Sequence, residues 1–196
     1  MSRVYVTPIL EGKMKPVWPP ERQKQLEETT DMQHRRARYT AWRLLRYALM
    51  EELGLELEQL QFTLEDGKWT CPDCYLSISH SGRLVAVAVG KKPVGVDLQK
   101  HQKLNPQLAD KILTPTQMEQ YKKLEPMAQN DLLLRFWCEK ECLFKMRKGK
   151  TFRPKQWESK PSLQFTTLFY WDDTYALVAN ADLVTLWSDG RWNLKY

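Results

Sequence analysis

The chain has 196 residues, of which 42% are hydrophobic and 28% charged, as in an ordinary globular domain. No apolar run approaches the ~20 residues of a membrane span, and residues 1–10 lack the parts of a secretory signal. Four cysteines do not suggest a disulfide framework, so we expect a cytoplasmic protein without a membrane partner. The net charge of +6 suits a polyanionic ligand or an acidic protein partner, although charge alone does not exclude nucleic acid.

The first half of the chain alternates strands and one long helix. Residues 3–9 are typical of a strand, and three prolines predict a loop over residues 12–20. Apolar residues at helical spacing predict a helix over residues 31–53, with Gly54 as its C-terminal stop. A turn is expected at residues 65–68. Residues 75–79, 84–89 and 94–98 are predicted strands, and the last two are apolar enough to be buried on both faces.

Helices and then strands follow in the second half. Helices are predicted over residues 106–113, from Thr114 or Thr116 onward, and over residues 126–148. Strands are predicted at residues 163–171 and 175–179, joined by a hairpin turn at 172–174, with a possible last strand at 184–187. The order of elements predicts an α+β fold in which a coarse plan occurs twice. Residues 1–93 and 94–196 are the two expected halves.

Three short segments combine residue types that suit phosphate chemistry. They are Ile-Ser-His-Ser-Gly at 78–82, Gly-Val-Asp-Leu-Gln at 95–99, and Trp-Cys-Glu-Lys-Glu-Cys-Leu-Phe-Lys at 137–145. Asp97 and Gln99 point to the same face of their strand, since strand side chains alternate. Glu141 adds a carboxylate, and such oxygen ligands are those that Mg²⁺ prefers. Lys145 lies one helical turn from Glu141, so both could reach one phosphate.

Each segment alone has a simpler explanation. A glutamate four residues before a lysine is a common surface pair, worth ~0.2–0.5 kcal/mol. A single aspartate after a strand and a Ser-His-Ser-Gly turn are frequent turn or capping features. The hypothesis therefore depends on the joint presence of the three segments in this order.

Together, the segments resemble the three hallmark stretches of the 4′-phosphopantetheinyl transferase superfamily, of the Sfp-like type. The resemblance runs from about residue 35 to residue 150 and includes the turn at Gly67-Lys68. It implies two similar α+β halves related by a pseudo-two-fold axis, the first contacting coenzyme A phosphates and the second carrying the metal and the catalytic helix. It also implies a reaction, namely transfer of phosphopantetheine from coenzyme A to a serine of an apo acyl or peptidyl carrier protein, releasing 3′,5′-ADP.

The resemblance implies a role for each matching residue. Asp97 and Glu141 correspond to metal-binding acids, with Glu141 also the proposed base for the carrier serine. Lys145 corresponds to the lysine beside the pyrophosphate, which is thought to assist the leaving group. The expected coenzyme A contacts are Lys68, Ser79, His80, Lys140, Lys145 and one or more of Arg35, Arg36 and Arg38. The implied cofactor is Mg²⁺, with Mn²⁺ as an alternative, and the implied partner is an acidic carrier protein bound by a monomer.

Two positions depart from the family pattern. Gln99 stands where the family has glutamate, which removes one negative charge and predicts weaker metal binding. Trp69 replaces a proline, which affects the loop more than the chemistry. A basic nucleic-acid-binding module and a carrier-binding scaffold without catalysis remain alternatives, and the four cysteines (Cys71, Cys74, Cys138 and Cys142) leave zinc binding as a weaker one.

Overall fold

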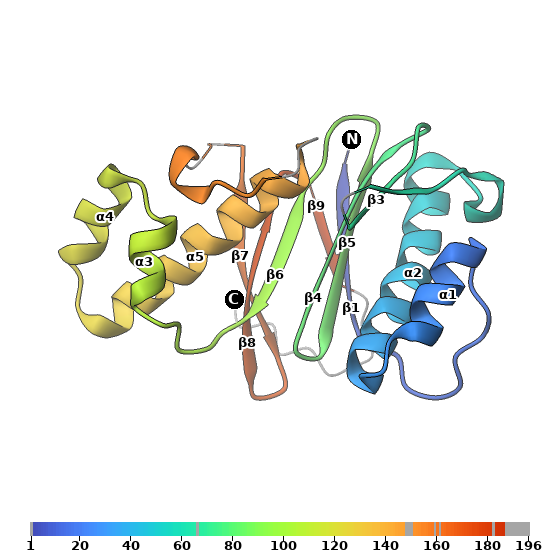
Figure 1. Ribbon diagram of the computed structural model, residues 1–196, viewed down its shortest axis with the longest axis horizontal. Coiled ribbons are helices and arrows are strands. Elements are labelled where there is room, and N and C mark those ends of the chain that lie inside the picture. Colours follow the sequence, from blue (N-terminus) through green and yellow to red (C-terminus); the bar gives the residue numbers. More distant parts are fainter. Residues whose placement is uncertain are drawn as a thin grey trace.

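Two β-sheets pack face to face at the centre of the computed structural model, which describes residues 2–65, 67–147, 151–158, 160, 162–181 and 183–186. The first sheet has the strand order β4-β5-β1-β9, from Tyr75–Ser81, Leu84–Gly90, Arg3–Pro8 and Leu183–Leu186. The second has the order β6-β8-β7, from Val96–Lys100, Asp173–Ala179 and Gln164–Tyr170. Figure 1 shows helices on the outer side of each sheet, so the α+β prediction is confirmed.

The layers follow from the alternation of apolar side chains in the strands. Val4 and Val6 of β1 face the second sheet, where they share a core cluster with Leu98 and Leu177. The neighbouring Tyr5 faces the other way and packs with α2. Opposite faces of one strand therefore serve two cores, as the two-residue period of a strand dictates. This explains why β5 is buried along its whole length.

On the first sheet, the outer layer consists of α1 (Pro20–Glu28) and α2 (Met32–Leu53). The predicted limits of α2 are confirmed: the Asp31 carboxylate caps the helix by accepting from the His34 N–H at 2.7 Å, and Gly54 ends it at φ 64°. Helix α1 begins at Pro20, inside the predicted loop, because proline is tolerated in the first turn of a helix. A small hairpin, β2 (Thr63–Glu65) and β3 (Lys68–Thr70), follows the 3-10 helix at Leu57–Gln59.

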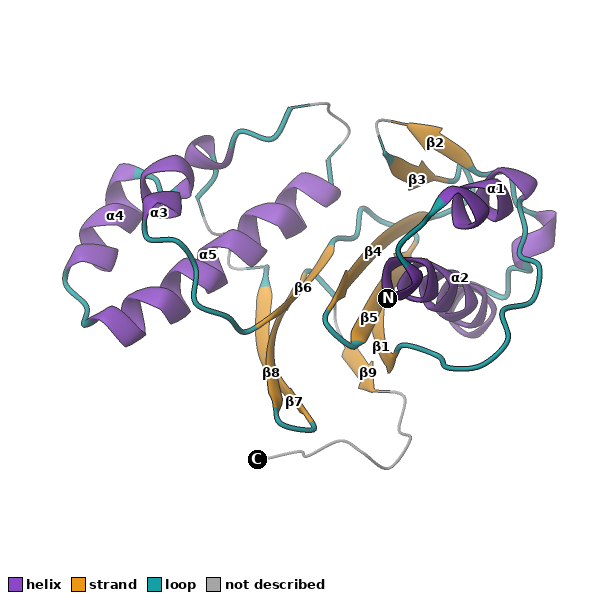
Figure 2. Cartoon of the chain, turned by 60° about the horizontal axis from the view of Figure 1, so that its bottom comes forward, coloured by secondary structure: helices purple, strands orange, loops and turns teal. Residues whose placement is uncertain are grey.

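The long helix α5 (Pro126–Lys145) covers the outer face of the second sheet, and two shorter helices pack against α5 (Figure 2). They are α3 (Gln107–Ile112) and α4 (Pro115–Lys122). Cys138 and Cys142 of α5 pack on Ala176 and Val178 of β8. A loop containing the 3-10 helix Pro154–Gln156 runs from residue 151 to residue 158 beside α5.

The hairpin between β7 and β8 turns earlier than predicted. Trp171, at φ 55°, forms the turn, and Asp173 and Thr174 already belong to β8. Other predicted features extend beyond the described residues: Asp66 in the first turn, Lys148 at the end of the long helix, and Trp187 at the last strand. Within the described part of the chain, no helix is long and apolar enough to cross a membrane.

Strand β9 lies in the first sheet, where it pairs in parallel with β1 from Arg3↔Leu183 to Val6↔Leu186. The predicted division into residues 1–93 and 94–196 stays a prediction. Although β9 comes from the C-terminal part of the sequence, it lies in the sheet that the N-terminal strands form. The predicted pseudo-two-fold relation between the halves also stays a prediction.

Candidate functional site

A ladder of serine hydroxyls joins the two sheets where β4 and β6 lie side by side. The hydroxyl oxygens of Ser77, Ser79 and Ser81 accept hydrogen bonds from the backbone N–H groups of Val96, Leu98 and Lys100, at 3.1, 3.1 and 2.9 Å. The serines alternate with Ile78 and His80, so all three hydroxyls point to the same side of β4. The Ser-His-Ser segment thus fixes β6, and with it Asp97, against the first sheet.

Asp97 is 1% exposed and lies at the centre of a polar cluster. Its Oδ1 accepts from Lys145 Nζ at 2.6 Å and from the Ser79 hydroxyl at 3.0 Å. Lys145 Nζ also donates to the Ser79 hydroxyl at 3.0 Å and to the Val96 carbonyl at 3.2 Å. The amide nitrogen of Gln99 donates to Asp97 Oδ2 at 3.3 Å. A buried carboxylate is stable only with such partners, so four of the residues predicted from sequence are brought together.

Glu141 lies on α5 one turn before Lys145 and lines a cavity of about 1070 Å³. Burial raises the pKa of the Glu141 carboxyl, and the nearby negative charge of Asp97 raises it further, against a smaller lowering by Lys145 and Lys68. Because the charge of Asp97 disfavours ionisation of Glu141, a cation bound near both carboxylates would be stabilising.

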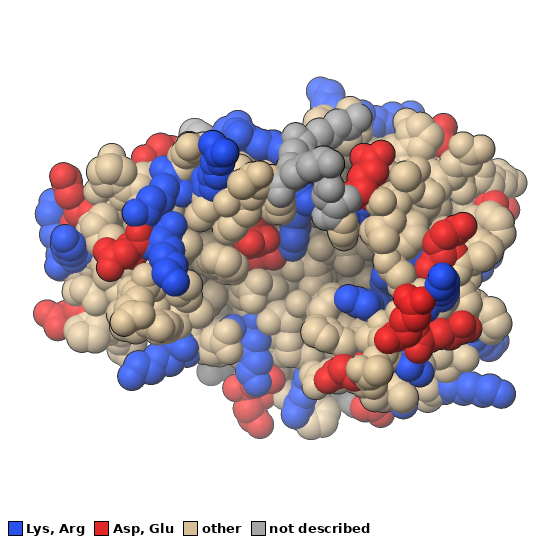
Figure 3. Space-filling view, in the orientation of Figure 1, with Lys and Arg blue, Asp and Glu red and all other residues tan. Residues whose placement is uncertain are grey.

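The same cavity is lined by the predicted Arg38, Lys68, His80 and Lys145. Figure 3 shows Lys and Arg side chains bordering the hollowed middle of the molecule, between the helices of the two sheets. Burial is the main reason that the pKa of His80 falls to about 4, with the neighbouring His34, Arg38 and Lys145 as further causes. The His80 ring is therefore neutral at pH 7 and can donate or accept one hydrogen bond per nitrogen.

Lys68 connects the small hairpin to α5 across the cavity. Its Nζ donates to the Phe144 carbonyl at 3.0 Å and lies 3.4 Å from the centroid of the Phe144 ring. A cation at the last carbonyls of a helix is favourable, and so is a cation over an aromatic face. Lys68 is thus held at the wall of the cavity by two different interactions.

Three predicted residues are placed elsewhere. Arg36 lines a separate cavity of about 1320 Å³, formed between α2 and the segment at residues 7–12. Arg35 donates to the Thr29 and Glu27 carbonyls, at 2.7 and 3.0 Å, next to the end of α1. Lys140 is 1% exposed and donates to the carbonyls of Pro154 and Trp157, at 2.8 and 2.6 Å.

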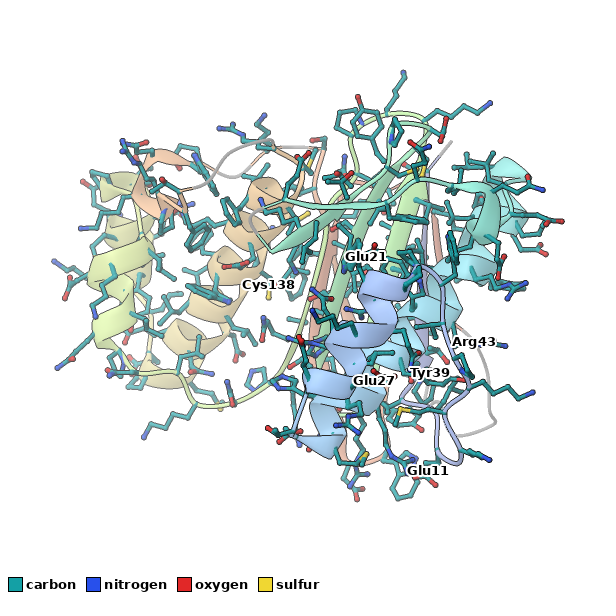
Figure 4. All side chains as sticks on the ribbon, turned by 45° about the vertical axis from the view of Figure 1, so that its right-hand side comes forward. Glu11, Glu21, Glu27, Tyr39, Arg43 and Cys138 are labelled. Carbon is teal, nitrogen blue, oxygen red and sulfur yellow. The ribbon has the colours of Figure 1, made fainter. Side chains whose placement is uncertain are left out.

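Two residues of the site were missed in the sequence. Arg22 of α1 lines the main cavity beside Arg38, is 5% exposed, and lies 5.0 Å over the Trp42 ring. Burial, with the nearby charge of Arg38, lowers the pKa of Arg22 to about 10. Arg22 was not predicted as a site residue, because the prolines at the start of its helix indicate a loop in the sequence. Cys138, on the side of α5 that faces the strands (Figure 4), lies next to Asp97, and burial followed by that charge raises the pKa of its thiol.

The cysteines do not form one cluster. Cys71 and Cys74 pack with the α2 core, whereas Cys138 and Cys142 pack between α5 and β8. Across the described ranges, no group of three His, Cys, Asp or Glu side chains is arranged to hold a metal. The predicted Mg²⁺ set differs from such a group, because it consists of two carboxylates and the amide of Gln99.

The site combines a cavity lined by basic side chains and Glu141 with the buried Asp97, an arrangement suited to a phosphate-containing ligand. The family model of the 4′-phosphopantetheinyl transferase superfamily matches residues 93–187. This segment, just under half of the chain, is similar to that superfamily. The match does not support the nucleic-acid-binding alternative.

The chain is similar to three curated bacterial proteins. A 4′-phosphopantetheinyl transferase of Bacillus subtilis is 31% identical over 106 residues, covering 52% of this chain and 47% of the relative. The 4′-phosphopantetheinyl transferase Sfp of Bacillus subtilis strain 168 is 26% identical over 111 residues, covering 55% and 49%. The 4′-phosphopantetheinyl transferase psf-1 of Bacillus pumilus is 26% identical over 107 residues, covering 53% and 46%. The chain thus aligns with about half the length of each relative.

Proposed function

We propose that the protein transfers the 4′-phosphopantetheine group of coenzyme A to a serine of an apo acyl or peptidyl carrier protein, releasing 3′,5′-ADP. The observation that carries the proposal is the convergence of Lys68, Arg38, His80, Glu141 and Lys145 on one cavity. They come from the hairpin, α2, β4 and α5, so several separate elements contribute side chains to one polar site. The match of residues 93–187 to the superfamily model supports the same activity.

The cations of the cavity suit the phosphates of coenzyme A. A guanidinium forms paired hydrogen bonds to phosphate, and an ammonium binds it as a point charge. We assign Arg38, together with the newly found Arg22, to one phosphate group, and Lys68 and His80 to the phosphates nearer α5. Ser79 is expected to act indirectly, because its hydroxyl is already hydrogen-bonded to Asp97 and Lys145 and so holds these two side chains in place.

Glu141 is the proposed general base. The serine hydroxyl of the carrier attacks the β-phosphorus, its proton passes to the Glu141 carboxylate, and the bond to the bridging pyrophosphate oxygen breaks. A carboxyl whose pKa is raised by burial holds that proton better than an ordinary one. Lys145 stabilises the negative charge that develops on the departing 3′,5′-ADP.

The residues present fit a divalent cation. Asp97 and Glu141 supply the hard oxygen donors that Mg²⁺ prefers, and the charge of Asp97 disfavours ionisation of Glu141 when no cation lies near them. Gln99 would have to turn its amide, because its nitrogen now faces Asp97. When bound, the ion would neutralise charge on the phosphate oxygens. Mn²⁺ accepts the same ligands and is the alternative.

An acidic carrier protein is the proposed partner, because the net charge of +6 favours its approach. We further propose that residues 1–93 and 94–196 are two similar halves related by a pseudo-two-fold axis. Such a chain holds both halves of the site and is expected to be a monomer in the cytoplasm. Light scattering during size-exclusion chromatography would test the monomeric state.

The decisive experiment is transfer of phosphopantetheine to an apo carrier protein, followed by mass spectrometry. Glu141→Gln and Asp97→Asn are each expected to lower kcat/KM at least about 100-fold. A loss of this size is usual when a general base, here Glu141, or a charged group of the site, here Asp97, is neutralised. Glu119→Gln, on the exposed surface of α4, is the matched control and is expected to keep full activity.

Near-normal transfer by either site variant would overturn the assigned roles. An inactive wild-type enzyme that still binds the carrier would favour the scaffold alternative. Salt-sensitive binding to random DNA without transfer would favour the nucleic-acid alternative.

A further inference from the structure

Lys140 is a buried cation between two acidic neighbours on α5. Consecutive residues of a helix point about 100° apart, so Lys140 does not share the direction of Glu141. It is absent from the described lining of the main cavity, whereas Glu141 belongs to that lining. Its ammonium instead donates to the Pro154 and Trp157 carbonyls, which flank the short 3-10 helix of the loop at residues 151–158.

That loop carries aromatic side chains that pack against the cavity wall. The Trp157 ring stacks on Phe144, with centroids 5.9 Å apart and planes at 22°. Phe152 meets Phe144 edge-on at 5.3 Å and Trp157 edge-on at 5.5 Å. We call these three residues, Phe144, Phe152 and Trp157, the aromatic cluster.

The aromatic cluster reaches the cavity through Phe144. Lys68 lies over the Phe144 ring and is bonded to its carbonyl, and both residues line the cavity. Arg147, another lining residue, lies 5.2 Å over the Trp157 ring. Two cations of the cavity wall, Lys68 and Arg147, therefore lie over aromatic rings. The ring under Arg147 belongs to Trp157 of the loop itself.

A buried ammonium is costly unless its donors are satisfied. Short charge-assisted hydrogen bonds to two carbonyls of one loop satisfy two of the three donors of Lys140. The same bonds fix the loop to α5 at both ends of its 3-10 helix. The ammonium of Lys140 thus holds the loop on α5. An apolar side chain at this position would leave the Pro154 and Trp157 carbonyls without this donor.

We propose that Lys140 is a positioning residue for coenzyme A, which acts through the loop at residues 151–158 and the aromatic cluster to hold Lys68 and Arg147 in the cavity wall. This inference rests on the proposed function. It gives Lys140 a different role from the direct contact that the family resemblance implies.

The test is a double-mutant cycle with Lys140→Met and Trp157→Leu, in which coenzyme A binding is measured by calorimetry. Each single variant is expected to weaken binding about tenfold, and the double variant by little more than either, because both changes break the same support. Lys140→Arg retains a cation with several donors and is expected to recover much of the affinity. Lys122→Met, in the exposed last turn of α4, is the control and should bind as wild type does.

Hydrogen exchange of the loop amides provides a readout independent of activity. Lys140→Met is expected to speed exchange at residues 155–158, while Lys122→Met leaves it unchanged. Unchanged loop exchange in Lys140→Met, or losses of affinity that multiply to about 100-fold in the double variant, would overturn the proposal in favour of direct phosphate contact. A wild-type enzyme that binds no coenzyme A would instead overturn the proposed function, and the exchange data would still decide whether Lys140 fixes the loop.

Discussion

At the residue scale, the chemistry centres on how Asp97 is neutralised. Its two oxygens are shared among Lys145, the Ser79 hydroxyl and the Gln99 amide. The proposed metal ion would therefore have to coexist with an ammonium 2.6 Å from Oδ1. The number of negative charges around the site then becomes decisive for metal affinity.

Gln99→Glu is expected to tighten Mg²⁺ binding about tenfold, because a third carboxylate replaces the amide of the proposed set. The measurement is the Mg²⁺ concentration that gives half-maximal transfer. Gln102→Glu, on an exposed position outside the cluster, is the control. An unchanged metal dependence in Gln99→Glu would show that residue 99 does not influence the ion.

His80 makes stability depend on pH. Its pKa falls from 6.5 in the unfolded chain to about 4 in the folded protein, with burial as the main cause. Between these values the unfolded chain binds more protons, so the free energy of unfolding decreases as the pH falls through this window. The raised pKa of Glu141 works in the opposite direction, because its contribution is lost as the pH rises.

His80→Asn is therefore expected to reduce the loss of stability between pH 7 and pH 4 by roughly 2–3 kcal/mol. Urea unfolding at both pH values measures the difference. His101→Asn, at an exposed histidine paired with Asp131, serves as the control. The same pH dependence in wild type and His80→Asn would contradict the assignment of this effect to His80.

At the element scale, local sequence patterns predicted individual helices and strands better than the contacts between them. Helix α2 was placed correctly because its cap residues, Asp31 and Gly54, and its apolar spacing agree. The three chemical segments also fell on the expected strand, strand and helix. Local patterns carry that information. They do not carry the packing of Arg22 on Trp42, or the partners of Lys140, which depend on contacts between distant segments.

Helix α2 offers an element-scale test, since it carries Arg38 and depends on one capping side chain. Asp31→Ala removes the acceptor for the His34 N–H and is expected to destabilise the protein by about 1 kcal/mol. Urea unfolding at pH 7 measures the change. Asp31→Asn retains an acceptor oxygen and should stay within a few tenths of a kcal/mol of wild type, so equal losses in both variants would argue against a capping role.

At the scale of the whole molecule, the excess of positive charge is expected to make the proposed reaction with the carrier protein sensitive to salt. The KM for an acidic carrier is expected to rise at least threefold as NaCl increases from about 50 to about 500 mM, because salt screens long-range attraction. Steady-state transfer measures this. A carrier variant with fewer acidic residues is the control and should respond less. A KM that does not change with salt would exclude electrostatic recruitment.

The pairing of β9 with β1 has a consequence for how the protein is made. The first strand of the chain leaves the ribosome early, but its neighbour at residues 183–186 is synthesised last of all the described strands. Until then, one edge of β1 is an open template for pairing with another chain. Nascent or truncated products that end before β9 are therefore expected to be aggregation-prone, because β1 gains its second neighbour only in a chain that extends through β9.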